Sequence, residues 1–230
     1  MVLAAGHGRG ADVFPLPIAT PRAIHPAMES LLALLLGYVL GSIPFGLLLA
    51  LAAGKGDIRQ QGSGNIGATN VLRTGSKGLA AGTLLLDMGK GLLAVLLAQH
   101  LFVQPAAMPA AAFGPVPLAA LGAVLGHCFP MWLKFKGGKG VATNAGVAFG
   151  LGWPIGLAYA LVWLAVLALA RISSLAGMSA VVAAAVAAAV LGFASFVPVL
   201  AVIALLVIWL HRANIARLRA GTEPRVGAKS

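Results

Sequence analysis

The sequence predicts an all-α, polytopic integral membrane protein: a helical bundle of about seven transmembrane segments, with its N-terminus outside and its C-terminus in the cytoplasm. Of its 230 residues, 60% are hydrophobic and 9% are charged, whereas about a quarter of residues are charged in a soluble domain. Apolar stretches recur along the chain at roughly the 20-residue length that a helix needs to cross a bilayer. With seven segments, 13 of the 16 Lys and Arg residues fall in connections on the same side of the membrane. Because Lys and Arg are enriched in cytoplasmic loops, we predict that this side is the cytoplasmic one.

The N-terminal extension, residues 1–27, is rich in Gly, Pro and Ala and lacks the apolar core of a signal peptide. We expect it to be disordered, with Met28 as an alternative start. Residues 28–230 then form a single membrane domain that ends in a basic cytoplasmic tail, residues 211–230.

The first predicted span, residues 30–53, contains the interruption G-S-I-P-F-G, in which we expect Ser42 and Pro44 to serve packing. Such a break frees backbone groups that neighbouring helices must satisfy. The second span, residues 78–103, carries Asp87 and Lys90, three residues apart and therefore on one helical face. Charge is costly at that depth. An ion pair that fastens the helix and a role in substrate binding both remain open.

The later segments are separated by Gly, Pro and small polar residues. In order we expect a Pro/Ala-rich connection at 104–116, a span at 117–133, a short segment at 141–150, spans at 153–170, 175–192 and 195–210, and a polar turn at 171–174. The tail after residue 210 is basic and amphipathic.

Two glycine-rich polar loops interrupt the apolar pattern, at residues 55–77 and 134–144. Closely spaced glycines let successive N–H groups converge on an anion, and Lys or Arg neutralises its charge. We therefore predict a phosphate site, with Lys139 as its foremost cation; a flexible loop and a simple helix anchor are the alternatives. The second loop lacks the spacing and the preceding strand of a Walker A motif.

The same composition argues against several other functions. The net charge of +11 is expected beside membrane spans and, without a soluble basic domain, predicts no nucleic-acid partner. Five acidic residues, with no HExxH motif and no Cys/His cluster, predict no metal and no cofactor. Cys128, the single cysteine, excludes an internal disulfide.

Five linked motifs resemble those of the bacterial acyl-phosphate:glycerol-3-phosphate acyltransferase family. They are G-S-I-P-F-G, G-S-G-N-I-G-A-T-N-V-L-R, D-M-G-K-G, G-H-C-F-P-x5-K-G-G-K-G-V-A-T and H-R-A-N-I-A-R-L-R-A-G-T-E-P. The resemblance spans residues 31–225 and implies a seven-helix enzyme of the bacterial inner membrane, active on its cytoplasmic face and free of metal. It implies acyl transfer from acyl phosphate to position 1 of glycerol 3-phosphate, which yields lysophosphatidic acid and phosphate. Besides these substrates we expect membrane lipids as partners, and we expect the protein to be a monomer.

The resemblance also implies the site residues. Ser63, Arg73 and Lys139 are the expected catalytic residues, the two cations stabilising charge on the carbonyl oxygen and the departing phosphate. The expected substrate-binding residues are Gly64, Asn65, Thr69, Asn70, Lys90, His127, Gly138, Thr143, Ser174, His211 and Asn214. Of these, Asn65 and Asn70 are expected to shape the first loop, while Ser174, His211 and Asn214 match positions associated with glycerol 3-phosphate.

The resemblance implies that a substrate phosphate oxygen accepts the hydroxyl proton, which makes His127 structural. Cys128 replaces the aromatic residue of typical members, and a thiol nucleophile there is the alternative. An H-x4-D match at residues 7–12 is attributed to chance. An organophosphate transporter and a lipid-binding scaffold also remain open, although we find no inverted repeat of the transporter kind.

Overall fold

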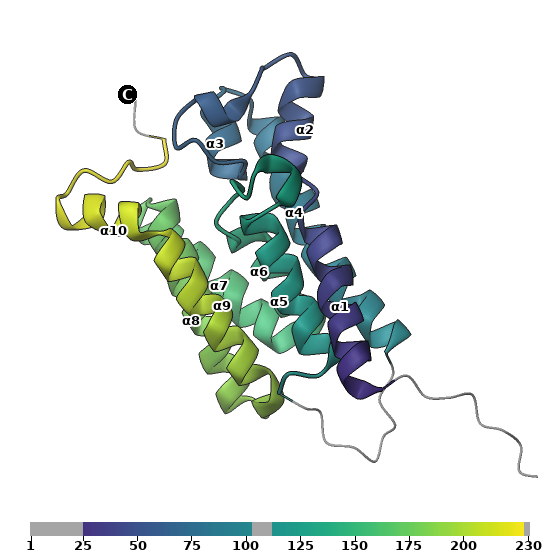
Figure 1. Ribbon diagram of the computed structural model, residues 1–230. Coiled ribbons are helices and arrows are strands. Elements are labelled where there is room, and N and C mark those ends of the chain that lie inside the picture. Colours follow the sequence, from purple (N-terminus) through teal and green to yellow (C-terminus); the bar gives the residue numbers. More distant parts are fainter. Residues whose placement is uncertain (1–24, 103–111, 228–230) are drawn as a thin grey trace, which may run out of the picture.

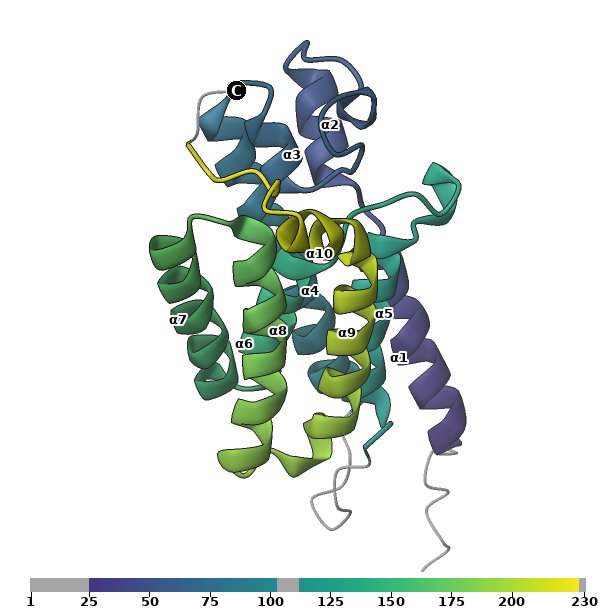
Figure 2. The same cartoon turned by 90° about the vertical axis from the view of Figure 1, so that its left-hand side faces the viewer.

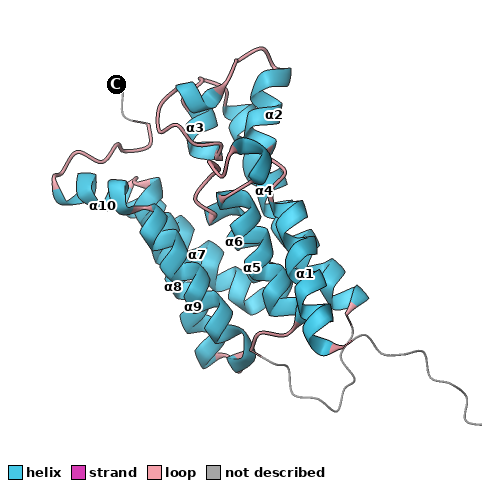
Figure 3. Cartoon of the chain, in the orientation of Figure 1, coloured by secondary structure: helices cyan, strands magenta, loops and turns pink. Residues whose placement is uncertain are grey.

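The computed structural model describes residues 25–102 and 112–227, in which every regular element is a helix (Figures 1 and 3). The helices are α1 (Pro26–Gly41), α2 (Phe45–Ala52), α3 (Ala68–Leu72), α4 (Lys77–Leu101), α5 (Pro115–Cys128), α6 (Val141–Leu151), α7 (Trp153–Ala170), α8 (Ser173–Val190), α9 (Val197–Leu210) and α10 (Arg212–Arg219), with the 3-10 helices η1 (Ile58–Gln60), η2 (Met131–Leu133) and η3 (Ala194–Phe196). The all-α prediction is confirmed for this part of the chain. The predicted disordered extension up to residue 24, its H-x4-D match and most of the 104–116 connection lie outside the described residues.

Five helical segments of the described chain are long and apolar enough to cross a membrane. They are Pro26–Ala52, Lys77–Leu101, Pro115–Leu133, Trp153–Ala170 and Ser173–Val190. A sixth is reached if η3 with α9 and the bent α10 count as one broken span. Helix α6 has 11 residues, or about 16 Å of rise, which is about half of the hydrocarbon thickness of roughly 30 Å. The number seven and the orientation remain predictions.

The polar loops meet at one end of the bundle. Helices α2 and α3 lie at the top of Figure 1 and α10 lies at the left below them, whereas the start of α1 and the turn between α8 and α9 lie at the bottom; Figure 2 shows the same order from the side. Large apolar side chains face outward, among them Leu169 at 87% and Val190 at 73% exposure. The main interior cluster is built largely from Ala and Val. This distribution is that of a protein solvated by lipid.

Helices α1 and α5 pack through matched small residues. Both carry a GxxxG pattern, Gly37 with Gly41 and Gly122 with Gly126. A Cβ on Gly41 would lie 2.0 Å from the Ala123 carbonyl oxygen. The backbones are therefore in direct contact, which is how helices gain van der Waals energy where lipid removes the hydrophobic driving force.

The predicted break in the first span lies between α1 and α2, at Ser42–Pro44. Its freed carbonyl groups are satisfied by other elements, as expected. The Trp132 indole donates to the Ser42 carbonyl at 2.8 Å, and the Lys90 ammonium donates to the Ile43 carbonyl at 2.7 Å. The Ser42 hydroxyl donates to the Val39 carbonyl at 2.8 Å, a local packing role.

Several predicted boundaries were wrong at their ends. Pro26 and Ala27, assigned to the extension, are helical, because Pro26 suits the first helical turn and His25 caps it. The third span ends at residue 133 as predicted, but only α5 up to Cys128 is α-helical, since Pro130 follows and the 3-10 helix η2 completes the segment. Ser174, assigned to a polar turn, lies in the first turn of α8.

The first polar loop is also more ordered than an open connection. It contains η1 and the short helix α3. The second loop ends at residue 140, because α6 begins at Val141 and includes the positions that the prediction gave to the loop, Thr143 and Asn144. The basic tail forms α10, which bends away from α9 by 59°.

We expect Gly122→Leu to lower the melting temperature in detergent by roughly 5 °C or more, since its Cβ would lie 2.2 Å from the Leu34 carbonyl oxygen and would force α1 from α5. Gly89→Leu is the matched control, because a Cβ at the exposed Gly89 on α4 meets nothing within 4 Å. Equal melting temperatures for the two variants would contradict the close packing of α1 on α5.

Candidate functional site

A cleft of about 810 Å³ opens at the end of the bundle where the polar loops meet. All three predicted catalytic residues, Ser63, Arg73 and Lys139, line it. Six of the predicted binding residues line it as well, namely Asn65, Thr69, His127, Ser174, His211 and Asn214. The cleft therefore gathers side chains from both glycine-rich loops, α5, α8 and the C-terminal segment.

Asn70 holds the first loop in shape. Its side-chain oxygen accepts hydrogen bonds from the Ser63 backbone N–H at 2.9 Å and hydroxyl at 3.2 Å. Its amide donates to the carbonyls of Ile58 and Asn65 at 2.7 and 2.8 Å. Asn70 is 1% exposed and does not line the cleft. The expectation that Asn70 shapes the loop agrees with these contacts.

Tight turns bring Ser63 to the cleft. Gly62 and Gly64 on either side of it have φ of 57° and 69°, in the left-handed region that favours glycine. The Asn65 amide donates to the Ser63 hydroxyl at 2.9 Å. Arg73 follows α3 as its C-terminal cap and is exposed. Its guanidinium is thus presented at the cleft wall beside Ser63.

The second loop is bound to the end of α5. The N–H groups of Gly137 and Gly138 donate to the carbonyls of Cys128 and His127 at 3.1 and 3.0 Å. A Cβ on Gly138 would lie 2.0 Å from His127 Nε2, so only glycine fits against the imidazole. This contact fixes the position of Lys139, the next residue.

The Lys139 ammonium lies inside the cleft and donates to the Asn214 side-chain oxygen. Burial lowers the pKa of Lys139, as does repulsion from Arg217 and Arg73, while Glu223 opposes this shift. Lys139 is therefore a cation whose charge is incompletely compensated by the protein. An anion that enters the cleft would restore that compensation.

Glu223 ties the C-terminal segment to the bundle, and sequence reasoning missed it. Its carboxylate accepts hydrogen bonds from Ser174 on α8 and from Asn214 on α10, both at 2.6 Å, and from Arg217 at 2.7 Å. Burial opposes its charge, but these hydrogen bonds outweigh burial and lower the pKa of Glu223. The sequence did hold one indication of this role, since Glu223 is the only acidic residue in a basic tail.

Asp87, Lys90 and His127 form a buried group beneath the cleft. The Lys90 ammonium lies 2.7 Å from Asp87 Oδ1, so the predicted ion pair on one helical face is confirmed. His127 Nδ1 lies 3.6 Å from the same oxygen. Asp87 and His127 reach the cleft, whereas Lys90 turns to the break in the first span. In the structure Lys90 therefore joins Asp87 of its own helix to the break in the first span.

Five predicted binding residues do not line the cleft: Gly64, Asn70, Lys90, Gly138 and Thr143. Thr143 is buried in α6 where that helix meets Gly91 of α4. Lining residues that the prediction omitted include Asp87, Trp163, Arg217, Glu223 and Arg225. Arg217 and Arg225 add two cations to Arg73 and Lys139, so positive charge predominates and the site suits an anion.

His211, at the bend between α9 and α10, is buried and lines the cleft. Its Nδ1 lies 2.7 Å from the Val207 carbonyl oxygen, so Nδ1 carries the proton.

Among residues 25–102 and 112–227, no group of three or more His, Cys, Asp or Glu side chains could hold a metal ion.

Comparison with known proteins gives matches over most of the chain. The family model described as glycerol-3-phosphate acyltransferase matches residues 31–221. A glycerol-3-phosphate acyltransferase of Novosphingobium aromaticivorans is 66% identical over 202 residues, which are 88% of this chain and 98% of the relative. One of Erythrobacter litoralis is 63% identical over 202 residues, with the same two shares.

Solved structures are also similar. The crystal structure of PlsY (YgiH), an integral membrane glycerol 3-phosphate acyltransferase, in its glycerol 3-phosphate form has a TM-score of 0.78 and 38% identity. The match covers 86% of this chain and 96% of that one. The lysophosphatidic acid form gives a TM-score of 0.76 at 37% identity, with the same coverage.

We expect Glu223→Gln to loosen residues 220–227, because the amide loses the charge and part of the acceptor capacity that three donors share. Tryptic cleavage after Arg219 and Arg225 at pH 7 should then be at least about fivefold faster than in the wild type. Thr222→Ala is the control, since its hydroxyl makes only a 3.4 Å contact with the Arg217 carbonyl. Unchanged cleavage in Glu223→Gln would contradict the anchoring role.

The same contact predicts a pH dependence. Because the folded pKa of Glu223 is lowered, its stabilisation is fully present above the unfolded value of about 4.3 and is lost as pH falls through the lower folded pKa. Hydrogen exchange of residues 220–227 should therefore accelerate across that acidic window beyond its intrinsic pH dependence. Glu223→Gln should lack this step.

Proposed function

Because the chain belongs to the glycerol-3-phosphate acyltransferase family, an integral membrane family, we propose that it uses acyl phosphate as its donor. It would transfer the acyl chain to the 1-hydroxyl of glycerol 3-phosphate and release lysophosphatidic acid and inorganic phosphate. The observation that carries this proposal is the convergence of Arg73 and Lys139, from two separate glycine-rich loops, on one cleft at the end of the bundle. Both proposed substrates carry a phosphate that such a cleft suits.

The cleft has two sides that fit two phosphate compounds. Ser63, Thr69 and Arg73 lie on the side of the first loop, where we place the acyl phosphate. Ser174, His211 and Asn214 lie on the side of α8 and α10, where we place glycerol 3-phosphate. The Lys139 ammonium contacts Asn214 and therefore reaches the side where we place glycerol 3-phosphate. In this proposal the loop that carries Lys139 also borders the acyl phosphate.

The supporting residues keep these groups in place. Asn65 and Asn70 hold the first loop, and Gly64 makes its turn. Gly138 and His127 set the second loop, while Lys90 and Thr143 lie in the helices beneath. In this proposal they serve the substrates through the shape of the cleft.

In the proposed reaction the glycerol hydroxyl oxygen attacks the acyl carbonyl carbon, and the bond from that carbon to the phosphate oxygen breaks. Arg73 and Lys139 stabilise the negative charge on the carbonyl oxygen and on the departing phosphate, and Ser63 lies beside the acyl phosphate on the first loop. Positioning and charge stabilisation are sufficient because the donor is already activated.

The hydroxyl proton passes to a substrate phosphate oxygen in this proposal. Two carboxylates line the cleft, and both are engaged: Glu223 accepts from three donors, and Asp87 is paired with Lys90. The lowered pKa of Glu223 makes it a weak base. His127 is 3% exposed and packs against Gly138, in keeping with a structural role.

Cys128 is a poor candidate for a nucleophile. Its side chain is 2% exposed and does not line the cleft. It lies instead in the core cluster between α5 and its neighbours. The reaction in our proposal therefore has no acyl-enzyme intermediate.

The positive-inside distribution supports a cytoplasmic active site in the bacterial inner membrane. Arg59 in η1, Lys134 after η2 and Arg171 between α7 and α8 all lie outside the five candidate spans, as do Arg73 and Lys139 of the cleft. We further propose that the monomer suffices, since Ser63, Arg73 and Lys139 of the same chain all line the cleft.

The decisive experiment measures phosphate release by the purified protein from palmitoyl phosphate and glycerol 3-phosphate. Lys139→Ala and Arg73→Ala should each lower the rate at least about a hundredfold by removing transition-state contacts. Lys134→Ala, an exposed lysine of the same loop outside the cleft, is the matched control and should retain the rate. Near-wild-type turnover in both cleft variants would refute the proposed roles.

The donor is tested separately by replacing palmitoyl phosphate with palmitoyl coenzyme A. We expect no lysophosphatidic acid from the thioester, and equal product from both donors would overturn the donor assignment while leaving the family assignment intact.

Cys128→Ala addresses the thiol alternative. We expect its rate of phosphate release to stay within about twofold of the wild type, since the thiol lies outside the cleft. Loss of turnover in a variant that keeps its melting temperature would restore the nucleophile hypothesis.

A further inference from the structure

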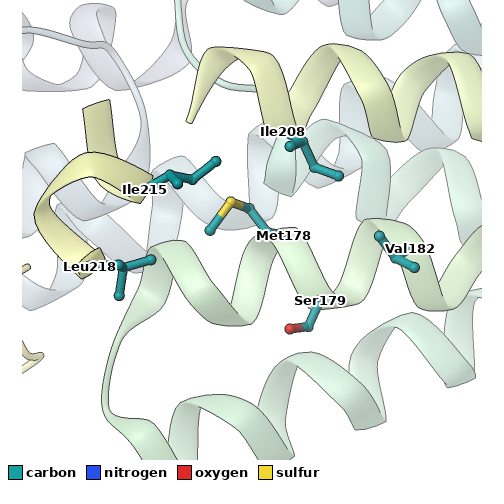
Figure 4. Close-up of a pocket in the computed structure, with 6 residues that line it drawn as sticks. All are labelled: Met178, Ser179, Val182, Ile208, Ile215 and Leu218. Carbon is teal, nitrogen blue, oxygen red and sulfur yellow. The ribbon is translucent and has the colours of Figure 1, made fainter. Parts of the chain in front are cut away.

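A second, apolar groove shares no lining residue with the cleft. It has a volume of about 560 Å³ and is lined by α8, α9 and α10. In Figure 4, Met178 lies between Ile208, Ile215 and Leu218, with Ser179 and Val182 further along α8. No lining side chain is charged, so the groove suits a hydrocarbon chain.

The depth of the groove matches the outer part of a bilayer leaflet. Met178 and Val182 follow the first residue of α8, Ser173, by five and nine positions, which places them roughly 8 to 14 Å below the start of the helix. Ile215 and Leu218 of α10 cover the upper end. An acyl chain that enters from the surrounding lipid would pass beneath α10.

Two arginines border the apolar face of α10. Arg212 and Arg219 are seven residues apart and therefore lie on one side of the helix, next to Ile215. Both are exposed, and in the described part of the chain neither forms an ion pair with a carboxylate. The Arg212 guanidinium lies 4.6 Å from the Trp209 ring centroid. Trp and Arg together are typical of the headgroup level of a membrane.

We propose that this groove binds one acyl chain of an anionic phospholipid, whose headgroup phosphate is held by Arg212 and Arg219. The apolar lining selects the chain, and the two uncompensated cations select a net negative headgroup over a zwitterionic one. The bound lipid would hold α10 against α8 and α9. The adjoining face of α10 carries Asn214 and Arg217, which contact Lys139 and Glu223 in the cleft, so the lipid would support the site from outside.

Binding is measured by native mass spectrometry of the detergent-purified protein, titrated with dioleoyl phosphatidylglycerol or dioleoyl phosphatidylcholine. The wild type should retain phosphatidylglycerol preferentially. The double variant Arg212→Gln with Arg219→Gln should lower that affinity by about tenfold or more, since each basic residue near an anionic surface contributes about a fivefold factor. Lys134→Gln with Lys136→Gln removes two charges at the same end of the bundle and should leave the affinity unchanged.

Val182→Phe narrows the groove and should weaken binding of both lipids, and its melting temperature reports whether the fold is kept. Equal phosphatidylglycerol affinity in the arginine double variant and the wild type would overturn the proposal. An equal loss of affinity in the lysine control would also overturn it, because that result would indicate diffuse surface charge. Displacement of the lipid by stoichiometric lysophosphatidic acid would overturn it as well, because the groove would then be a product site. None of these readouts depends on turnover, so they stand apart from the proposed reaction.

Discussion

The fold depends on one constraint of the bilayer: a backbone carbonyl exposed by a helix break must find a donor inside the protein. The break at Ser42–Pro44 meets this constraint with the indole of Trp132 and the ammonium of Lys90. Lys90 brings a charge into an apolar layer, and Asp87 neutralises it. His127 lies beside Asp87 and supports Gly138, the residue before Lys139. A packing requirement in the first span is thereby linked to the position of the principal cation.

The other side of the cleft is organised by a carboxylate that carries no chemistry in the proposed reaction. Glu223 brings together Ser174 and Asn214, from helices that are far apart in the sequence. In a cleft dominated by Arg and Lys, one buried acid can hold polar groups in place without cancelling the positive field. Asn70 likewise holds the first loop in place, through hydrogen bonds and without a charge. The residues that shape the cleft and those that face the substrates are thus largely different sets.

Much of this architecture was predictable because lipid imposes strong rules on sequence. The bounds of α7 and the break in the first span follow from apolar runs and Gly/Pro interruptions, and the basic, amphipathic character of the tail that forms α10 was also visible. The Asp87–Lys90 pair follows from helical spacing. Helix ends were less predictable, since Pro26 and Ser174 depend on caps and on partners elsewhere in the chain.

The sequence by itself determined that the protein is a helical membrane bundle with two glycine-rich loops suited to phosphate, and its motifs indicated the family. Only the tertiary structure decided which residues face the cleft and which support it. Lys90 and Gly138 carry the same motif signal as Lys139, yet one fastens a helix break and the other makes room for an imidazole. Glu223 stands out in the sequence only as a lone acid in a basic tail. The reason is physical: composition and periodicity report what a segment must bury, whereas a side chain's role depends on partners that other segments supply.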